Sequence, residues 1–205
     1  MDAINPDHAQ DATREKLLAA AHRQFAARGY FGASIAQIAG EVGLTKQALL
    51  YHFRRKEDLY TQVLKGIANR MLTDMRAGID PSKPAAEQFE ELVLGIYASA
   101  QSNPLDVKVL MRELLDDQRR DAPPSEWFFR TFIDEVVEVL DRIEGMDALP
   151  RSEKVARVYF ILSAIEYFSG STSVLTRFYG EDEYRNVAHA FPDQLRAAVH
   201  HLIKP

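Results

Sequence analysis

A short polar segment in the first quarter of the chain carries side chains suited to recognising nucleic-acid bases. Thr45, Lys46 and Gln47 follow Gly43, and a basic run, Arg54-Arg55-Lys56, comes shortly after them. A glutamine side chain can pair with adenine through two hydrogen bonds, and a lysine can neutralise a phosphate. The segment therefore predicts contact with DNA, provided that the fold presents it on an exposed helix.

Two short helices joined by a tight turn are predicted around this segment. Ser34 and Gln37 have the spacing of a capping box for one helix, which ends at Gly43, and Thr45 can cap the next, from Lys46 to Phe53. This arrangement is typical of a helix-turn-helix, whose second helix enters the major groove with its N-terminus first. The exposed face is expected to carry Thr45, Lys46, Gln47, Ala48, Tyr51 and His52.

Helical periodicity extends over nearly the whole chain, because apolar residues recur every three or four positions. A first helix is expected between a cap at Thr13 and a break at Gly29. Later helices are expected at about 85–101, 104–120, 125–144, 152–176 and 184–204. Pro192 is either the first-turn residue of a final helix or a kink in a longer one. The fold class is therefore all-α, with about nine helices.

The predicted organisation is a helix-turn-helix domain at 11–56 and a larger helical domain at 57–205, in which 57–79 is a connecting helix. Charge supports this division. Residues 11–60 hold eight lysines and arginines against five acidic residues, whereas 61–205 hold seventeen against twenty-three, and the whole chain carries −5. A basic N-terminal segment followed by an acidic remainder is typical of a DNA-binding module joined to a domain that does not bind DNA.

Residues 13–59 resemble the N-terminal domain of the tetracycline-repressor (TetR) family. The resemblance is carried by Thr13-Arg14, Leu17-Leu18, Phe25, Gly29-Tyr30, Ser34, Ile38-Ala39, Val42-Gly43-Leu44-Thr45-Lys46, Leu49, His52-Phe53 and Lys56-Glu57. The rest of the chain matches this family only in its pattern of amphipathic helices. The resemblance implies a homodimeric, cytoplasmic transcriptional regulator, most often a repressor that a small-molecule effector releases from double-stranded operator DNA.

Site residues follow from the same resemblance. Ser34 would touch phosphate at the start of the second helix, with Gln37 on the same helix, and His52 and Lys56 would lie near the DNA backbone. The family usually has tyrosine at position 50, where this chain has Leu50. Leucine cannot donate a hydrogen bond to phosphate, so that contact is absent or moves to Tyr51.

The larger domain is rich in aromatic residues, which fill a core or line a ligand pocket. The pocket candidates are Tyr97, Met111, Trp127, Phe128, Phe132, Phe160, Glu166 and Tyr167. The resemblance further implies that the last two long helices pair with their copies in a dimer. Val199 and Leu202 are expected at that interface.

Several function classes are disfavoured by what the sequence lacks. It has no cysteine, which excludes disulfides and thiolate metal sites. It has no phosphate-binding glycine loop and no hydrolase motif, so neither an enzyme nor a metal or cofactor is expected. Its apolar runs are far shorter than the ~18 residues that span a bilayer, so no membrane partner is expected. The alternative functions are a helical protein-interaction module without ligand-controlled DNA binding and, less favoured, an α-helical enzyme.

Overall fold

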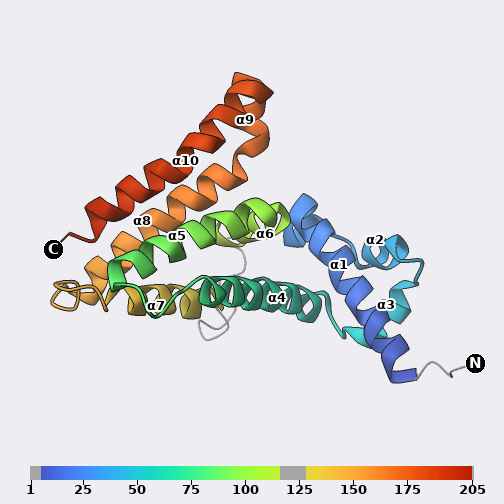
Figure 1. Ribbon diagram of the computed structural model, residues 1–205. Helices are drawn as coiled ribbons and strands as arrows, with labels where there is room; N and C mark the ends of the chain where they lie inside the picture. Colours follow the sequence, from blue (N-terminus) through green and yellow to red (C-terminus); the bar gives the residue numbers. More distant parts are fainter. Residues whose placement is uncertain (1–5, 116–127, 205) are drawn as a thin grey trace, which may run out of the picture. The chain divides into compact units, whose positions relative to one another are not determined.

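The computed structural model describes residues 6–115 and 128–204, and all ten regular elements of these residues are α-helices (Figure 1). The all-α expectation is confirmed. The helices are α1 (Pro6–Gly32), α2 (Ile35–Glu41), α3 (Lys46–His52), α4 (Lys56–Ala77), α5 (Ala85–Ser102), α6 (Pro104–Leu115), α7 (Phe128–Leu140), α8 (Arg151–Gly170), α9 (Thr172–Tyr179) and α10 (Glu181–Leu202).

The helix count exceeds the expected nine because the segment 152–176 is two helices. The backbone leaves the helical path at Ser171, whose N–H donates to the carbonyls of Tyr167 and Phe168 at 3.0 and 3.2 Å. A new helix, α9, then begins at Thr172. Of the two alternatives for Pro192, the structure shows the longer helix: this proline lies inside α10 and does not start a helix of its own.

The first helix begins earlier than expected. It starts at Pro6, so Thr13 lies inside α1 and is not its N-terminal cap. The expected break at Gly29 is present: this residue has φ 69° and ψ 178°, outside the helical region, although helical turns resume as far as Gly32. Only glycine adopts such a conformation readily, because it has no Cβ.

The chain divides into two compact units, which we call the N-terminal and C-terminal units. The N-terminal unit comprises Met1–Ile67 and Lys108–Asp117, and the C-terminal unit comprises Ala68–Val107 and Gln118–Pro205. Helices α4 and α6 each contribute residues to both units. The inclusion of part of α6 in the N-terminal unit has no counterpart in the sequence pattern.

The core of the N-terminal unit supports the two short helices. Helix α1 packs against α2, and α2 packs against α3. Leu17 of α1, Ile38 of α2 and Leu49 of α3 are completely buried. Phe25 meets the ring of Tyr60 edge-on, with 4.7 Å between the ring centroids. Burial of large apolar side chains is the main favourable term in folding, so this core fixes α3 relative to α1.

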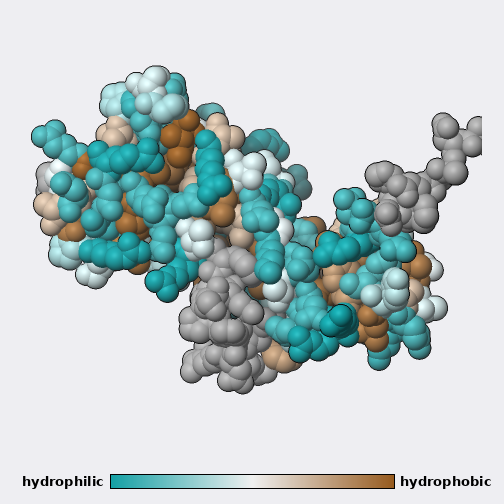
Figure 2. All heavy atoms as spheres, turned by 90° about the horizontal axis from the view of Figure 1, so that it is seen from below, coloured by the Kyte–Doolittle hydropathy of each residue, from teal (hydrophilic) through white to brown (hydrophobic). Residues whose placement is uncertain are grey.

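The C-terminal unit is a helical layer structure centred on α5 and α8. Helix α5 packs against α7, α8 and α10, and α8 also packs against α7, α9 and α10. Phe89, Phe132 and Ile165 are among its fully buried side chains. On the face seen in Figure 2, patches of hydrophobic residues interrupt a mostly hydrophilic surface.

Within the described residues, no single helix combines the length and apolar character needed to cross a membrane. One pair of helices, Arg151–Gly170 and Thr172–Tyr179, meets the length and composition criteria together but is bent by 60°.

Candidate nucleic-acid interface

The turn between α2 and α3 is fixed by backbone hydrogen bonds and one glycine. Gly43 has φ +74°, the left-handed conformation that glycine adopts without strain. The carbonyl of Ala39 accepts hydrogen bonds from the N–H groups of Val42 and Leu44, at 3.2 and 2.9 Å. These bonds satisfy the end of α2 and set the direction in which α3 starts.

Helix α3 presents its N-terminal half to solvent. Thr45 caps the helix as expected, since its Oγ1 accepts a hydrogen bond from the backbone N–H of Ala48 at 3.2 Å. Lys46 and Gln47, in the first turn, are exposed. Leu49 points the other way and is completely buried. An exposed polar first turn on a buried apolar support is the geometry that a helix needs in order to enter a major groove.

The second half of α3 shows the consequences of leucine at position 50. Leu50 is half-buried, whereas Tyr51 is 75% exposed and meets the ring of His52 edge-on at 5.5 Å. His52 is itself half-buried. The aromatic side chain exposed in this half of α3 is therefore Tyr51, at the position after Leu50.

The expected capping box of α2 does not form. Ser34 occupies the N-cap position, with φ −110° and ψ 132°, but its side chain makes no capping hydrogen bond. Gln37 is exposed, and its Oε1 lies 3.4 Å from the Arg28 guanidinium, which donates to it. Because the Ser34 hydroxyl has no capping role in this structure, a contact with phosphate would cost α2 no hydrogen bond.

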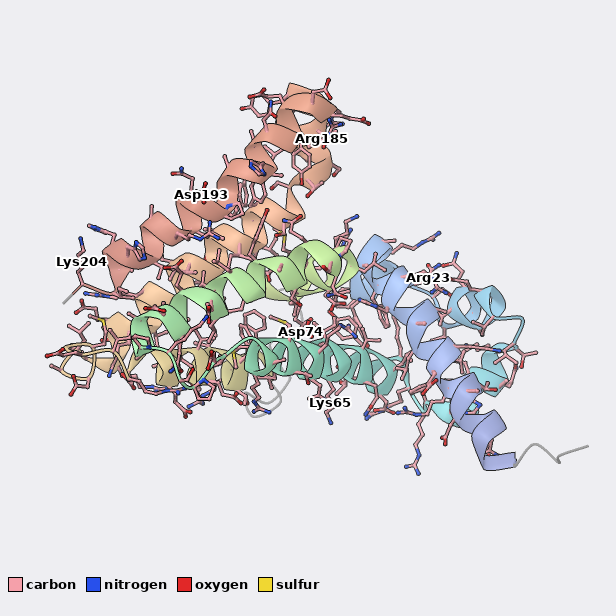
Figure 3. All side chains as sticks on the ribbon, in the orientation of Figure 1. Arg23, Lys65, Asp74, Arg185, Asp193 and Lys204 are labelled. Atoms are coloured by element: carbon pink, nitrogen blue, oxygen red, sulfur yellow. The ribbon has the colours of Figure 1, made fainter. Side chains whose placement is uncertain are left out.

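A small polar cluster joins α2 to α1. The carboxylate of Glu41 accepts hydrogen bonds from Arg23 Nε at 2.6 Å and from Gln24 Nε2 at 3.0 Å (Arg23 is labelled in Figure 3). These two bonds hold the pKa of Glu41 below its ordinary value, with the Gln24 bond as the larger cause. The end of α2 that precedes the turn is thus tied to the side of α1.

The basic run after α3 does not act as one patch. Arg55 pairs with Asp58 at 3.0 Å. The Lys56 ammonium lies over the ring of Tyr30, 4.6 Å from its centroid, and partial burial lowers the pKa of this lysine. Arg54 is exposed. Lys46 and Arg54 are therefore the more accessible cations of this region.

Sequence reasoning missed the contribution of α6 to this unit. The Arg112 guanidinium donates from Nε to the carbonyl of Ala26 at 3.2 Å and from Nη2 to that of Ala27 at 3.1 Å. In the next position, Glu113 accepts a 2.8 Å hydrogen bond from the hydroxyl of Tyr60. The partners of Arg112 lie 86 and 85 positions away, so no local sequence pattern could signal them.

The expected pocket residues that the structure describes lie in different environments. Tyr97 and Phe132 are buried in the C-terminal unit, and Phe128 begins α7 there. Phe160 and Tyr167 lie on the surface of α8, 61% and 72% exposed, and do not line the interior. Helical geometry explains this difference, because positions 160 and 167 share one face of α8 while Ile161 and Ile165 fill the core face. Trp127 lies outside the described residues.

The two remaining pocket candidates differ from each other. Met111 belongs to the part of α6 that is assigned to the N-terminal unit, whereas Glu166 belongs to the C-terminal unit. Glu166 lies on α8 with its Oε2 atom inaccessible and without a hydrogen-bond partner. Among the described residues, no group of three or more histidine, aspartate or glutamate side chains could hold a metal ion.

Taken together, the buried support, the tight turn and the exposed polar first turn of α3 define a helix-turn-helix protein. Residues 17–63 match the family model described as bacterial regulatory proteins, tetR family. A TetR-like transcriptional regulator from Rhodococcus sp. RHA1 has a similar fold, with a TM-score of 0.69 and 20% identity over 92% of this chain and 94% of that one. The match of residues 17–63 to this family model, together with the similar fold, confirms the resemblance on which the helix-turn-helix assignment drew.

Two curated relatives extend the comparison. The HTH-type transcriptional regulator RutR of Escherichia coli K12 is 34% identical over 91 residues, 44% of this chain and 43% of that protein. The HTH-type transcriptional activator FasR of Mycolicibacterium smegmatis is 22% identical over 139 residues, 68% of this chain and 64% of that protein. The matches thus span about half to two thirds of these relatives. Regulators of the TetR family are not enzymes, which agrees with the expectation from the sequence.

Proposed function

We propose that this chain is a homodimeric DNA-binding transcriptional repressor that an apolar or aromatic small molecule releases from its operator. The DNA-binding part of this proposal is supported mainly by the exposed first turn of α3. Lys46 and Gln47 are exposed there, while Leu49 is buried in the core. In this proposal Gln47 recognises a base, and Lys46, Tyr51 and the Ser34 hydroxyl contact phosphates.

The proposed contacts divide into two kinds. Thr45, Ala48 and Gln47 lie close enough to the helix N-terminus to meet base edges. His52 ends α3, Lys56 begins α4 and Gln37 lies on α2, and in this proposal these three meet the DNA backbone. Base contacts set sequence preference, while backbone contacts set overall affinity and its dependence on salt.

The dimer part rests on an exposed stripe along α8, formed by Ala156, Phe160, Ser163 and Tyr167. These residues are four, three and four positions apart, the spacing with which helices pair along a common seam. One helix-turn-helix domain makes few base contacts. Specific binding at physiological salt therefore favours a dimer that places two such domains on two half-sites. Val199, expected at the interface, is instead 1% exposed within its own unit. The α8 stripe therefore replaces it as the centre of the proposed interface.

The ligand part rests on the aromatic interior of the C-terminal unit. Tyr97 approaches Phe168 and Phe191, with ring centroids 6.2 and 5.3 Å apart, and Phe168 stacks on Phe191 at 3.9 Å. An apolar interior with a few polar groups is typical of small-molecule sites. By linkage, a ligand that lowers DNA affinity tenfold must bind the DNA complex ten times more weakly than the free protein.

The proposal is tested with DNA fragments from upstream of the chain's own gene, in an electrophoretic shift with unrelated DNA as competitor. We expect a specific complex that contains two chains. Gln47→Ala is expected to cost about 1–3 kcal/mol and to relax preference at one base pair in each half-site. A protein-interaction module would bind neither fragment preferentially. A promoter–reporter assay then gives the sign of regulation: deletion of the gene raises expression if the protein is a repressor.

Release by ligand is tested through the fluorescence of Trp127, the one tryptophan of the chain. Apolar and aromatic compounds are screened for quenching, and those that bind are titrated with and without the DNA fragment. We expect at least one compound to bind more weakly when DNA is present. Equal affinity in both titrations would contradict the release mechanism while leaving DNA binding intact.

A further inference from the structure

Four helices of the C-terminal unit direct polar side chains toward one region of α8. Arg70 of α4 donates two hydrogen bonds to the carboxylate of Asp106 of α6, at 2.9 and 3.0 Å. Gln101 of α5 donates to the hydroxyl of Ser169 of α8 at 3.1 Å. Glu166 lies three positions before Ser169, so both side chains lie on the same side of α8. The five residues form a polar cluster, and Asp106 and Ser169 are among the few buried polar residues of the described chain.

Glu166 is the member of this cluster with a buried carboxylate oxygen that has no hydrogen-bond partner. Its Oε2 atom is inaccessible and makes no hydrogen bond. Burial, with a smaller contribution from the negative charge of Asp106, raises the pKa of Glu166 to about 7. Buried carboxylates are nearly always hydrogen-bonded or paired, because losing water without a replacement is costly. A group left in this state is suited to receive a donor from outside the chain.

The charges around Glu166 indicate which donor fits. The cluster contains two carboxyl groups and one guanidinium, and Arg70 directs its Nε and Nη2 to Asp106. The one cation of the cluster is thus already paired with Asp106. A ligand with a negative charge would meet two carboxylates, whereas an ammonium group would supply both the missing donor and the missing charge.

Buried aromatic rings lie on the same two helices, α5 and α8. Tyr97 lies four positions before Gln101 on α5, and thus on the same side of that helix. It approaches Phe168, the neighbour of Ser169, which stacks on Phe191. Phe168 is two positions from Glu166 and therefore faces a different side of α8. Tyr97, on the same side of α5 as Gln101, is thus the ring that can lie beside a ligand whose charged end reaches Glu166.

We propose that Glu166 anchors a ligand that carries a protonated amine on an apolar or aromatic body, with Tyr97 beside that body. This inference rests on the proposed function in one respect, namely that the C-terminal unit binds a small molecule. It goes further by naming the charge of that molecule and the residue that selects it.

Proton linkage gives the proposal a second signature. Arg70 and Asp106 are the charged groups of the cluster that face Glu166 from α4 and α6, and they stay paired with each other when the ligand enters. An ammonium group favours the ionised carboxylate, so binding displaces the Glu166 proton below about pH 7. Affinity for an amine is then expected to rise with pH up to about 7 and to level off above it. A neutral ligand should show no such rise.

The test uses the full chain and matched probes: 2-naphthylmethylamine and a panel of other aryl- and alkylamines, each paired with the alcohol of the same skeleton. Calorimetry at pH 8 is expected to show amines that bind at least tenfold more tightly than their alcohols. Glu166→Gln, which preserves shape, should remove that preference and leave the alcohols unchanged. Glu138→Gln, an exposed acid on α7, is the control and should bind like the parent.

Three results would overturn the proposal: no amine in the panel binds, amines bind no better than alcohols, or Glu166→Gln retains the preference. Circular dichroism of the variant confirms that it is folded, so a loss of binding cannot be assigned to unfolding. DNA binding is measured in parallel without probe. Intact DNA binding, or release by a neutral compound, would preserve the proposed function even if the amine preference fails.

Discussion

The guanidinium of Arg112 donates to the carbonyl of Ala26, 3.2 Å away, at the point where α1 leaves its helical path. A second bond reaches Ala27, and Nη1 of the same arginine lies 3.5 Å from where a Cβ on Gly29 would be. The last carbonyls of a helical segment lack intrahelical donors, and a cation there also complements the helix dipole. Arg112 therefore supplies from α6 the cap that the α1 break requires.

Removing this cap should weaken the N-terminal unit. Arg112→Ala is expected to lower the free energy of unfolding by about 1–2 kcal/mol, because two carbonyls lose a charged donor. Arg112→Lys keeps the charge but lacks the planar guanidinium that can donate to two carbonyls at once. Its free energy of unfolding should therefore lie between those of Arg112→Ala and the parent. Urea unfolding provides the measurement. Arg130→Ala, whose contact with Asp134 is a weak 3.7 Å, is the control and should stay within about 0.5 kcal/mol of the parent.

The break itself depends on glycine. Gly29→Ala places a Cβ on a residue with φ +69° and ψ 178°, a region that L-residues avoid, and should destabilise the protein by about 1–3 kcal/mol. Gly66→Ala, on α4 and with nothing within 4 Å of the new Cβ, should instead stabilise it by up to about 1 kcal/mol. Thermal unfolding of the pair checks both signs. Equal effects would show that the Gly29 conformation is not needed.

The two glycines also show how far sequence reasoning extends. Gly29 and Gly43 are local signals, and both the break and the turn that they predict are present. The cap that satisfies the break comes from Arg112, far along the chain, and only the folded structure brings it there. The sequence analysis named Phe160 and Tyr167 as pocket candidates, but both are exposed on α8, since a single sequence does not say whether a second apolar face meets the same chain or another copy.

The exposed stripe of α8 makes a prediction about assembly. Phe160→Glu should shift the protein from dimer to monomer, because it places a charge at the centre of the proposed seam without disturbing the chain's own core. Phe31→Glu changes an aromatic residue of similar exposure, 58%, in the N-terminal unit and should leave the dimer intact. Sedimentation velocity at micromolar concentration separates the species. A parent protein that is monomeric there would refute the dimer, as would a Phe160→Glu variant that still dimerises.

Glu166 makes a prediction about pH and stability. Its folded-state pKa of about 7 lies above its ordinary value of 4.5, so the folded state holds this proton more strongly than the unfolded state does. The stabilisation of the folded state that results from this proton is fully present below pH 4.5 and is lost as the pH rises to about 7. Glu166→Gln does not titrate, so its stability relative to the parent should increase by about 2–3 kcal/mol between pH 5 and pH 8. Urea unfolding at both pH values measures the change, and a constant difference would contradict the unpaired burial of Glu166.

The central claim is that the exposed first turn of α3 contacts DNA, and the salt dependence of binding tests it most directly. Fluorescence anisotropy of the upstream fragment is measured from about 50 to 200 mM salt for the parent, Lys46→Ala and the control Lys108→Ala, which alters an exposed lysine on α6. Each lost phosphate contact lowers the slope of log affinity against log salt by about 1. We predict weaker binding and a flatter slope for Lys46→Ala, and parental values for Lys108→Ala. Parental affinity and slope in Lys46→Ala would contradict the account.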